Sequence, residues 1–450
     1  TANEGHLRKP EVSLPEILKA QGYTTGHYGK WHLGTLNPNF SGKGAGRDAA
    51  KNFMTPAMKG SDDWFATEYG VRLWDPFTDA AANPYYHNGT LETENLAGDD
   101  SRVLMDRAIP FIRKAAAAKT PFLAVIWFHA PHEPVVAGPE FRKMYAGRDE
   151  GEQHFYGVIT ALDVQMGRLR KELRDLGVAD NTLVWFTSDN GPEDYRVGNA
   201  ANAGVGSPGP LRARKRSMHE GGVRTFGLVR WPGKIPAGRV EESAVTGGVD
   251  FLPTIAALAG VKVPANLAAD GEDKSAHWLG AAATPRARPL YWEWISGVQG
   301  ADDGYLPPPL CVRDGDWKLF VRHDGQGAQL FNIPKDAAEK HDVAVAHPEV
   351  VKELTAKVLA WAKTLPASPA RDKFVAGATK AGPKSAPKAK STLDRPKIFV
   401  SWDKDNDGFL SKEEFIPHIA DKADAPARFV RFDTDKDGRL SKEEFVKASN

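Results

Sequence analysis

The stretch Pro121-Phe-Leu-Ala-Val-Ile-Trp-Phe-His129 is a short, continuous apolar run that ends in the proline-rich sequence Ala130-Pro-His-Glu-Pro134. Such a run is typical of a β-strand that is buried on both faces of a sheet. From about Gln153 to Leu176 apolar residues recur at helical spacing, and Thr182-Leu-Val-Trp-Phe-Thr187 is a second apolar run. Strand, helix and strand in this order predict a βαβ unit. The chain is therefore expected to have an α/β fold, in which helices flank a mainly parallel sheet.

Further elements predict how the chain divides into domains. A strand at Thr225–Trp231 and a helix at Asp250–Ala259 extend a first domain, which we place at residues 1–285. In residues 286–366, short aromatic-rich strands predict a small antiparallel sheet, and a helix is expected from Pro348 to Leu365. Residues 367–393 contain mostly Ala, Pro, Gly, Ser and Lys, which predicts a disordered linker. We favour a solvated linker over one whose lysines bind an acidic polymer or a membrane.

Residues 394–450 contain two copies of the 12-residue EF-hand calcium loop, starting at Asp403 and Asp433. Gly408 and Gly438 stand where each loop turns sharply. An acidic surface segment would not repeat this spacing twice, so we predict a separate, all-α pair of EF-hands. We expect their calcium to be structural or adhesive. The predicted Ca²⁺ ligands are Asp403, Asp405, Asp407, the Phe409 carbonyl, Ser411 and Glu414 in the first loop, and Asp433, Asp435, Asp437, the Arg439 carbonyl, Ser441 and Glu444 in the second.

Composition excludes several classes of protein. The 450 residues are 41% hydrophobic and 26% charged, which is typical of a soluble globular protein. The formal net charge of +1 gives no basic field for nucleic acid, and no apolar run is long enough for a transmembrane helix. Cys311 is the only cysteine, so no disulfide can form within the chain; its apolar neighbours predict a buried packing residue and not a nucleophile. Composition gives no indication of the oligomeric state.

Candidate chemistry begins in the segment Gly22-Tyr-Thr-Thr-Gly-His-Tyr-Gly-Lys-Trp-His-Leu-Gly34. In an extended chain the side chains of Lys30 and His32 would point to one face, and Trp31 would point into the body of the protein. Taken alone, a Lys-x-His sequence is usually a surface turn. With its flanking glycines, it is here a plausible anion-binding edge.

Other polar residues follow the predicted strands. In open α/β sheets the chemistry gathers beyond the carboxyl ends of the strands. His132 and the pair Asp189 and Asn190 stand there, and we expect His129 to be a packed, hydrogen-bonded residue. Lys215 lies in a basic run that precedes Glu220-Gly-Gly. Cations and hydrogen-bond donors around a tetrahedral anion, together with a proton donor for a leaving oxygen, are what ester cleavage at such a group needs.

The order of these motifs resembles one family. Gly-Lys-Trp-His-Leu-Gly, Pro-His-x-Pro, Ser-Asp-Asn-Gly-Pro and Lys-x-x-x-x-Glu-Gly-Gly occur here in the order found in type I sulfatases, whose fold resembles that of alkaline phosphatase. The segments Val249–Thr254 and Val312–Leu319 also resemble that family. The resemblance covers roughly residues 11–365 and is greatest to the branch of arylsulfatase A and N-acetylgalactosamine-6-sulfatase.

This resemblance implies roles for the candidate residues. Lys30, His132 and Lys215 would bind the substrate sulfate, and His132 or Lys215 would protonate the departing alkoxide. His32 would bind and activate the nucleophile's hydrate. Asp189 and Asn190 would ligate Ca²⁺. The substrate would be a sulfated carbohydrate or another sulfate ester.

The chain departs from the family in one respect. Members carry a Cys- or Ser-x-Pro-x-Arg element, whose first residue becomes the nucleophile formylglycine, and two more aspartates for the calcium site. No Cys or Ser in this chain begins such an element. We therefore expect the sequence to be truncated at its N-terminus, with formylglycine on the missing segment.

Two alternatives stay open at this point. A phosphoesterase of the same superfamily would need further His and Asp ligands for two zinc ions. A non-catalytic, calcium-dependent binder of sulfated glycans would need no nucleophile. The expected location, periplasmic or extracellular, rests on where sulfated polymers and millimolar calcium occur. We also expect the aromatic-rich segment 37–95 to help line a substrate mouth, although core packing explains its aromatic residues equally well.

Overall fold

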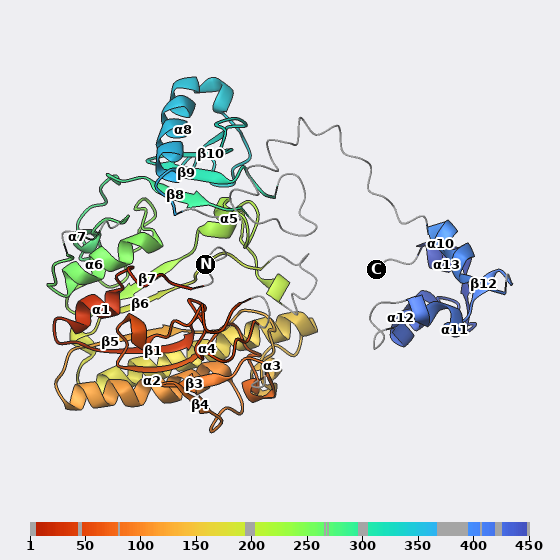
Figure 1. Ribbon diagram of the computed structural model, residues 1–450, viewed down its shortest axis with the longest axis horizontal. Coiled ribbons are helices and arrows are strands. Elements are labelled where there is room, and N and C mark those ends of the chain that lie inside the picture. The colour runs from red at the N-terminus through yellow and green to blue at the C-terminus, as the bar shows by residue number, and fades with distance from the viewer. Residues whose placement is uncertain are drawn as a thin grey trace. The chain divides into compact units, whose positions relative to one another are not determined.

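The computed structural model divides the chain into two units, Thr1–Phe374 and Val375–Asn450, which are described separately (Figure 1). The residues that the structure describes are 6–43, 47–79, 82–193, 203–264, 267, 270–295, 305–366, 395–405, 407–418 and 425–447. The predicted linker at 367–393 lies outside these residues. The domain boundary expected after residue 285 falls within the first unit and stays a prediction.

A mixed, five-stranded sheet forms one half of the first unit. Its strands are, in spatial order, β4 (Thr90–Glu92), β3 (Tyr85–His87), β2 (Asp63–Thr67), β1 (Thr24–Lys30) and β5 (Phe122–Trp127). β1 runs parallel to both β2 and β5, whereas β3 and β4 form an antiparallel extension. The helices α2 (Asp100–Ala117) and α4 (Glu150–Asp175) pack on this sheet through a core that includes Tyr28, Phe65, Leu104 and Leu173 (Figure 1).

The predicted strand–helix–strand order is confirmed as β5, α4 and β6 (Val184–Thr187). The expected pairing of the second strand is different. β6 forms a separate two-stranded sheet with β7 (Gly227–Arg230), and this pair is antiparallel. Periodicity predicts that β5 and β6 are strands, but it carries no information about which edges meet. The first unit also contains the short helices α1 (Leu14–Lys19), α3 (Pro139–Lys143), α5 (Glu220–Val223), α6 (Phe251–Leu258) and α7 (Ser275–Trp278).

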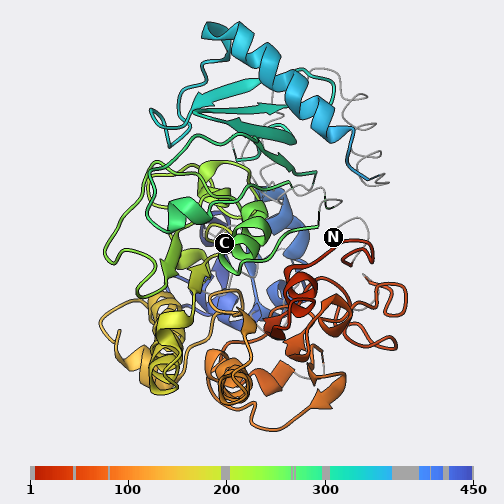
Figure 2. The same ribbon diagram turned by 90° about the vertical axis from the view of Figure 1, so that its left-hand side faces the viewer.

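The predicted small antiparallel sheet and its helix are also confirmed. β11 (Gln329–Asn332), β10 (Trp317–Val321), β9 (Leu310–Asp314) and β8 (Leu290–Glu293) are adjacent in this order. Helix α8 (Pro348–Ala362) lies along one face of the sheet, as Figure 2 shows, and contributes Leu354 and Val358 to a shared core. Cys311 is fully buried on β9, as its apolar neighbours predict.

The second unit contains two helix–loop–helix motifs. Their helices are α10 (Arg395–Trp402), α11 (Lys412–Phe415), α12 (Ala425–Phe432) and α13 (Lys442–Lys447), and the loops pair through β12 (Phe409–Leu410) and β13 (Leu440–Ser441). Phenylalanines from all four helices form the core. Each loop is thus held at both ends by a helix that is packed against the other motif.

Candidate active site

Lys30 is the last residue of β1 and is half-buried. The preceding residue, Gly29, has φ +108°, and a Cβ there would lie 2.0 Å from the carbonyl oxygen of Trp127. Only glycine therefore lets β1 run this close to β5 at the end that carries Lys30. Trp31 points into the core, as predicted, and its indole N–H donates to the Met54 carbonyl at 2.6 Å.

His32 lines the same cavity as Lys30, as predicted, but its side-chain direction does not come from strand alternation. Its φ of +52° is left-handed, so the strand ends before it and the alternation of an extended chain does not apply. Its backbone N–H donates to the Glu68 carbonyl at 2.8 Å, which fixes the turn. Burial lowers the pKa of His32 to about 3, and the positive charges of Lys43 and Lys30 act in the same direction.

His129 is the packed residue that the sequence predicts. It is 1% exposed, its Nδ1 lies 2.8 Å from Asp100 Oδ2, and its Nε2 lies 2.8 Å from the Thr67 hydroxyl. The His132 backbone N–H then donates to the His129 carbonyl at 2.8 Å. A buried hydrogen-bond network therefore positions the loop that carries His132.

The imidazole of His132 is half-buried and its tautomer is defined by one contact. Nδ1 lies 2.8 Å from the Glu133 carbonyl oxygen, which can only accept, so Nδ1 carries the proton and Nε2 is the free acceptor in the neutral ring. Burial lowers the pKa of His132 to about 3, with further lowering by Lys215 and Lys30. An anion bound between these three groups would reverse the electrostatic part of this shift.

Asp189 and Asn190 follow β6 directly. The Asn190 amide donates from Nδ2 to the Gly191 carbonyl at 2.8 Å, which leaves Oδ1 as the atom available to a metal ion. Gly191 is in turn so close to the next loop that a Cβ would lie 1.9 Å from the Gly221 carbonyl oxygen. The pair thus offers two hard oxygen ligands on a fixed turn, which fits part of a calcium site.

Lys215 is held by its own backbone. Its N–H donates to the Pro192 carbonyl at 2.9 Å, and its carbonyl accepts from the Tyr305 hydroxyl at 2.6 Å. Its ammonium lies 3.7 Å from Glu193 Oε2. Lys215 is therefore anchored between the turn that carries Asp189 and the segment that leads into β9.

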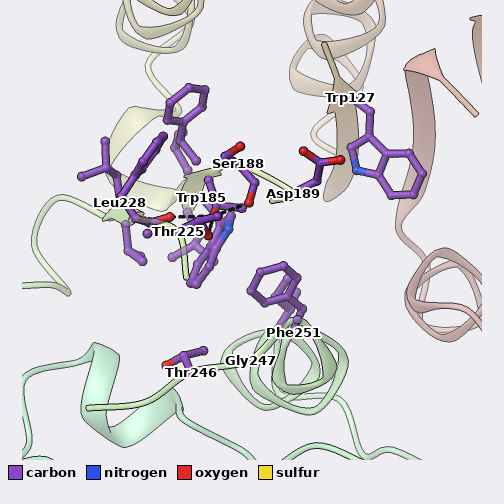
Figure 3. Close-up of a pocket in the computed structure, with 18 of the residues that line it drawn as sticks. Trp127, Trp185, Ser188, Asp189, Thr225, Leu228, Thr246, Gly247 and Phe251 are labelled. Atoms are coloured by element: carbon purple, nitrogen blue, oxygen red, sulfur yellow. Dashed lines mark hydrogen bonds between the residues drawn. The ribbon is translucent and has the colours of Figure 1, made fainter. Parts of the chain in front are cut away.

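The structure brings all the sequence-predicted residues of this domain to one cavity of about 3850 Å³. Figure 3 shows Trp127, Asp189 and Trp185 among the residues that line it. Mutual electrostatic effects agree with this placement. Burial lowers the pKa of Lys30, Lys215 lowers it further, and Asp189 raises it. Two ammonium groups, two imidazoles and a carboxylate thus converge beyond the carboxyl ends of β1, β5 and β6.

The same cavity extends between β5 and β6 and is mostly apolar there. β5 is the last strand of one sheet and β6 of another, so among the described residues one edge of each has no strand beside it. Trp127 on the edge strand β5 is 45% exposed and Leu228 on β7 is 59% exposed, so large apolar side chains face this space without being covered. This space opens directly onto Lys30, His132 and Asp189.

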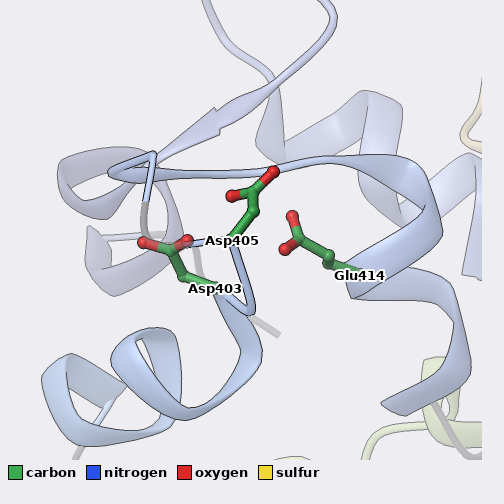
Figure 4. Close-up of side chains that lie close together, drawn as sticks. All are labelled: Asp403, Asp405 and Glu414. Carbon is green, nitrogen blue, oxygen red and sulfur yellow. The ribbon is translucent and has the colours of Figure 1, made fainter.

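In the second unit the predicted calcium ligands come together in part. Oxygens of Asp403, Asp405 and Glu414 lie within 4.8 Å of one another (Figure 4), as do those of Asp433, Asp435 and Asp437. Ser411 Oγ donates to Glu414 at 2.9 Å, and Ser441 Oγ donates to Glu444 at 2.8 Å. Asp407 and Glu444 lie outside these two clusters. The backbone carbonyls of Phe409 and Arg439 stay predicted ligands. Elsewhere in the described ranges no three acidic, His or Cys side chains form such a group.

Sequence reasoning missed the groups that support these residues. Lys318 is fully buried on β10, and its ammonium lies 2.8 Å from Glu220 Oε1 and 3.2 Å from Glu339 Oε1. Glu339 Oε2 also accepts from the Glu220 backbone N–H at 2.6 Å. The available signal was a lysine between Trp317 and Leu319, in a strand that is otherwise apolar. Its partners lie too far along the chain for periodicity to reveal them.

Comparison with known proteins shows to which family the chain belongs. The sulfatase family matches residues 1–261, and the family described as N-sulphoglucosamine sulphohydrolase, C-terminal, matches residues 213–364. The chain belongs to the sulfatase family. This sulfatase is therefore a sulfuric ester hydrolase by family, and its fold is that of the alkaline-phosphatase-like sulfatases. Residues 397–416 and 427–448 match the EF-hand family.

The relatives of this sulfatase cover most of its length. Human arylsulfatase A is 29% identical over 400 residues, which are 78% of this chain and 71% of the relative. N-acetylgalactosamine-6-sulfatase of Canis lupus familiaris is 31% identical over 399 residues, 80% of this chain and 70% of the relative. Among solved structures, Ps i-CgsB in complex with k-i-k-neocarrahexaose has a TM-score of 0.66 and 26% identity, with coverage of 80% of this chain and 75% of that one.

Proposed function

We propose that this sulfatase acts on sulfate esters of a carbohydrate, with the sulfate bound between Lys30, His132 and Lys215. The observation that carries the proposal is the convergence of these three side chains with Asp189 and Asn190 on one cavity. The two ammonium groups would compensate the charge of a tetrahedral anion, and Nε2 of His132, once protonated, would donate a hydrogen bond to it.

Proton transfer to the leaving oxygen is the second role that we propose, and His132 is placed for it. In the neutral ring its Nδ1 proton is committed to the Glu133 carbonyl. The bound anion would favour a second proton on Nε2, and this proton could then pass to the departing alkoxide. Lys215 is the alternative donor. Its ammonium lies 3.7 Å from Glu193 Oε2 at the same edge of the cavity.

Asp189 and Asn190 would hold Ca²⁺ through Asp189 Oδ and Asn190 Oδ1. When bound, the ion would polarise the sulfate and compensate its charge. Two ligands are fewer than the six to eight that calcium takes, so other oxygens must complete the site. We do not favour the phosphoesterase alternative, because the described residues around Asp189 contain no cluster of His and Asp side chains that could bind two zinc ions.

The nucleophile is the part of the proposal that this chain does not itself supply. Its one cysteine, Cys311, is fully buried, and burial raises the pKa of its thiol. We propose that formylglycine, carried on a segment outside the given sequence, provides the attacking oxygen and that His32 orients it. The apolar space between β5 and β6 supports this, because a strand placed there would end beside Lys30 and His132. Without that segment the same pocket would bind sulfated ligands without turnover.

Substrate and location are inferred from chemistry. Ps i-CgsB was solved in complex with k-i-k-neocarrahexaose, and a sulfated carbohydrate is the substrate class that we propose here. Calcium-loaded EF-hands would suit the periplasm or the extracellular space, where calcium is abundant. No helix within the described residues is long and apolar enough to cross a membrane.

Binding and turnover test this proposal separately. We expect a monosulfated sugar to bind to the chain in calcium buffer, as measured by calorimetry. Lys30→Ala or His132→Ala should weaken binding at least about tenfold, because each removes a charged or hydrogen-bonded contact to the anion. Lys234→Ala, which changes an exposed lysine elsewhere, is the matched control.

Sulfate release would be measured on the chain and on a version extended at its N-terminus. Release by the extended version only, with loss in Lys30→Ala, would support the formylglycine mechanism. Binding that is equal in all variants would contradict the assigned site.

A further inference from the structure

A second cationic position lies beside the proposed sulfate site, on the segment between β1 and β2. The Lys43 ammonium lies 5.5 Å from the centre of the Tyr69 ring. Lys43 is also the charge with the largest lowering effect on the pKa of His32 after burial. The described residues include no carboxylate in ion-pair distance of Lys43. The mechanism proposed above does not use it.

Lys43 is held in place by a buried carboxylate beneath it. Glu68, which is 4% exposed, accepts from the Ser41 hydroxyl at 3.0 Å and from the Gly42 backbone N–H at 2.9 Å. The charge of Glu68 is compensated by the buried Arg47, whose guanidinium lies 3.0 Å away. The turn before Lys43 is thus fixed while its ammonium stays exposed and free to bind an anion.

Tyr69 and Asn83 line a small hollow that connects this position with His132. The hollow measures about 250 Å³, and its walls include Tyr69, Asn83, His132 and Pro134. It is close to the catalytic imidazole, since a Cβ on Gly70 would lie 3.1 Å from His132 Nδ1. Asn83 is 2% exposed, and its Oδ1 has no hydrogen-bond partner within the described part of the chain. A buried acceptor of this kind is satisfied by a donor that a ligand brings.

These three features match the parts of one ligand. An aromatic face suits the apolar face of a sugar ring, an unpaired amide oxygen suits a sugar hydroxyl, and a free ammonium suits an anion. Tyr69 and Asn83 line the same hollow as His132, one of the residues proposed to bind the sulfate. A sugar ring bound at Tyr69 would therefore be the neighbour of the ring whose sulfate is cleaved. We propose that Lys43, Tyr69 and Asn83 form a subsite for an adjacent sugar residue that carries its own sulfate or carboxylate.

The inference rests on the proposed function and narrows its substrate to a polyanionic glycan. An aryl sulfate or an isolated monosulfated sugar would fill only the first site. Three other aromatic residues of segment 37–95, Trp64, Tyr85 and Tyr86, do not contribute to this subsite, because they are buried in the core. The expectation that they line a substrate mouth is therefore wrong for these three residues, and it stays a prediction for Tyr69 and Trp74.

Calorimetry on the full chain tests the subsite with three probes: inorganic sulfate, a monosulfated disaccharide, and a disulfated disaccharide with one sulfate on each ring. We expect the disulfated probe to bind about two- to fivefold more tightly than the monosulfated one, which is the gain typical of one exposed ion pair. Lys43→Met should abolish this difference and leave the affinity for inorganic sulfate unchanged. Lys51→Met, an exposed lysine of the same segment, should change neither.

A second variant tests the contribution of the Tyr69 ring separately from that of the Lys43 charge. Tyr69→Leu should weaken both disaccharides about equally and should not affect inorganic sulfate. Equal affinity of the wild-type chain for the two disaccharides would overturn the subsite while the sulfate site stands. An equal loss of affinity for all three probes in Lys43→Met would also overturn the subsite. If no probe binds, the subsite falls together with the proposed function.

Discussion

His27 illustrates what one buried residue contributes to the pH dependence of stability. It is 3% exposed, and its ring packs edge-on against Trp31 and Trp127 with ring centres 5.1 and 5.0 Å away. Burial lowers its pKa from 6.5 to about 3. Below pH 6.5 the unfolded chain therefore takes up a proton that the folded chain refuses until about pH 3. The free energy of unfolding should fall as the pH falls through this range.

We predict that His27→Leu reduces this pH dependence. Since one pKa unit corresponds to about 1.4 kcal/mol, His27 alone should cost the folded chain about 2 kcal/mol between pH 6.5 and pH 5. Urea unfolding followed by tryptophan fluorescence at both pH values gives the slope. His341→Leu, which replaces a 78% exposed side chain, should keep the wild-type slope. Parallel slopes in all three proteins would show that His27 does not titrate as described.

Single residues also show how far sequence reasoning reaches. Local context predicts that Trp31, His129 and Cys311 are buried, and the structure confirms all three. The same reasoning could not find Lys318, because its partner Glu220 lies 98 residues earlier in the chain. Nor could it distinguish Tyr69 from the buried aromatic residues around it. Burial follows from local pattern, whereas the choice of partner depends on the assembled fold.

At the scale of elements, the EF-hand loops show how a motif carries its own geometry. In the first loop Glu414 accepts from the Lys404 backbone N–H at 2.8 Å, so the last loop position already reaches back to the first ones. We predict that Glu414→Gln reduces the calcium affinity of this loop at least about tenfold, because the glutamate at the last loop position is the ligand that supplies two oxygens and the change also removes a negative charge. Calcium titration by calorimetry should show one equivalent fewer. Glu413→Gln alters the exposed neighbouring carboxylate and is the control.

Elements and their pairing differ in how well the sequence predicts them. Helix α4 spans Glu150–Asp175, close to the predicted 153–176, because 3.6-residue periodicity is a local property. The partner of β6 is β7 in antiparallel orientation, which no local pattern indicates. Likewise the left-handed φ of His32 interrupts the alternation on which its predicted direction was based. The position of the site beyond strand ends was nevertheless predicted, since it depends on the order of elements and not on their pairing.

For the first unit as a whole, Lys318 is the link between the C-terminal sheet and the loop of Lys215. Burial lowers the pKa of Lys318, but Glu220 and Glu339 raise it above its ordinary value, so the ammonium stays charged. We predict that Lys318→Met destabilises the chain by about 3–5 kcal/mol, because two buried carboxylates lose their counter-charge. Urea unfolding measures the loss. Lys352→Met, on the exposed face of α8, should be within about 0.5 kcal/mol of wild type.

A loss below about 1 kcal/mol in Lys318→Met would mean that water or the nearby Arg313 replaces the ammonium. Arg313 Nη1 lies 3.7 Å from Glu220 Oε2 and is the group best placed to do so. In that case the sheet and the Lys215 loop would be joined mainly by apolar packing. The double change Lys318→Met with Glu220→Gln, which removes both charges, should recover part of the stability if the charges are the cause.

The burial of Cys311 gives the molecule a built-in chemical reporter. The thiol packs with Met218, Phe320 and Phe331, so it sits where the C-terminal sheet meets the segment after Lys215. A thiol reagent can reach it only when this contact opens, and no other cysteine competes for the label. The labelling rate under native conditions therefore measures the frequency of that opening. Ligands that close the pocket should slow the reaction, which turns an inert residue into a readout of occupancy that needs no engineered probe.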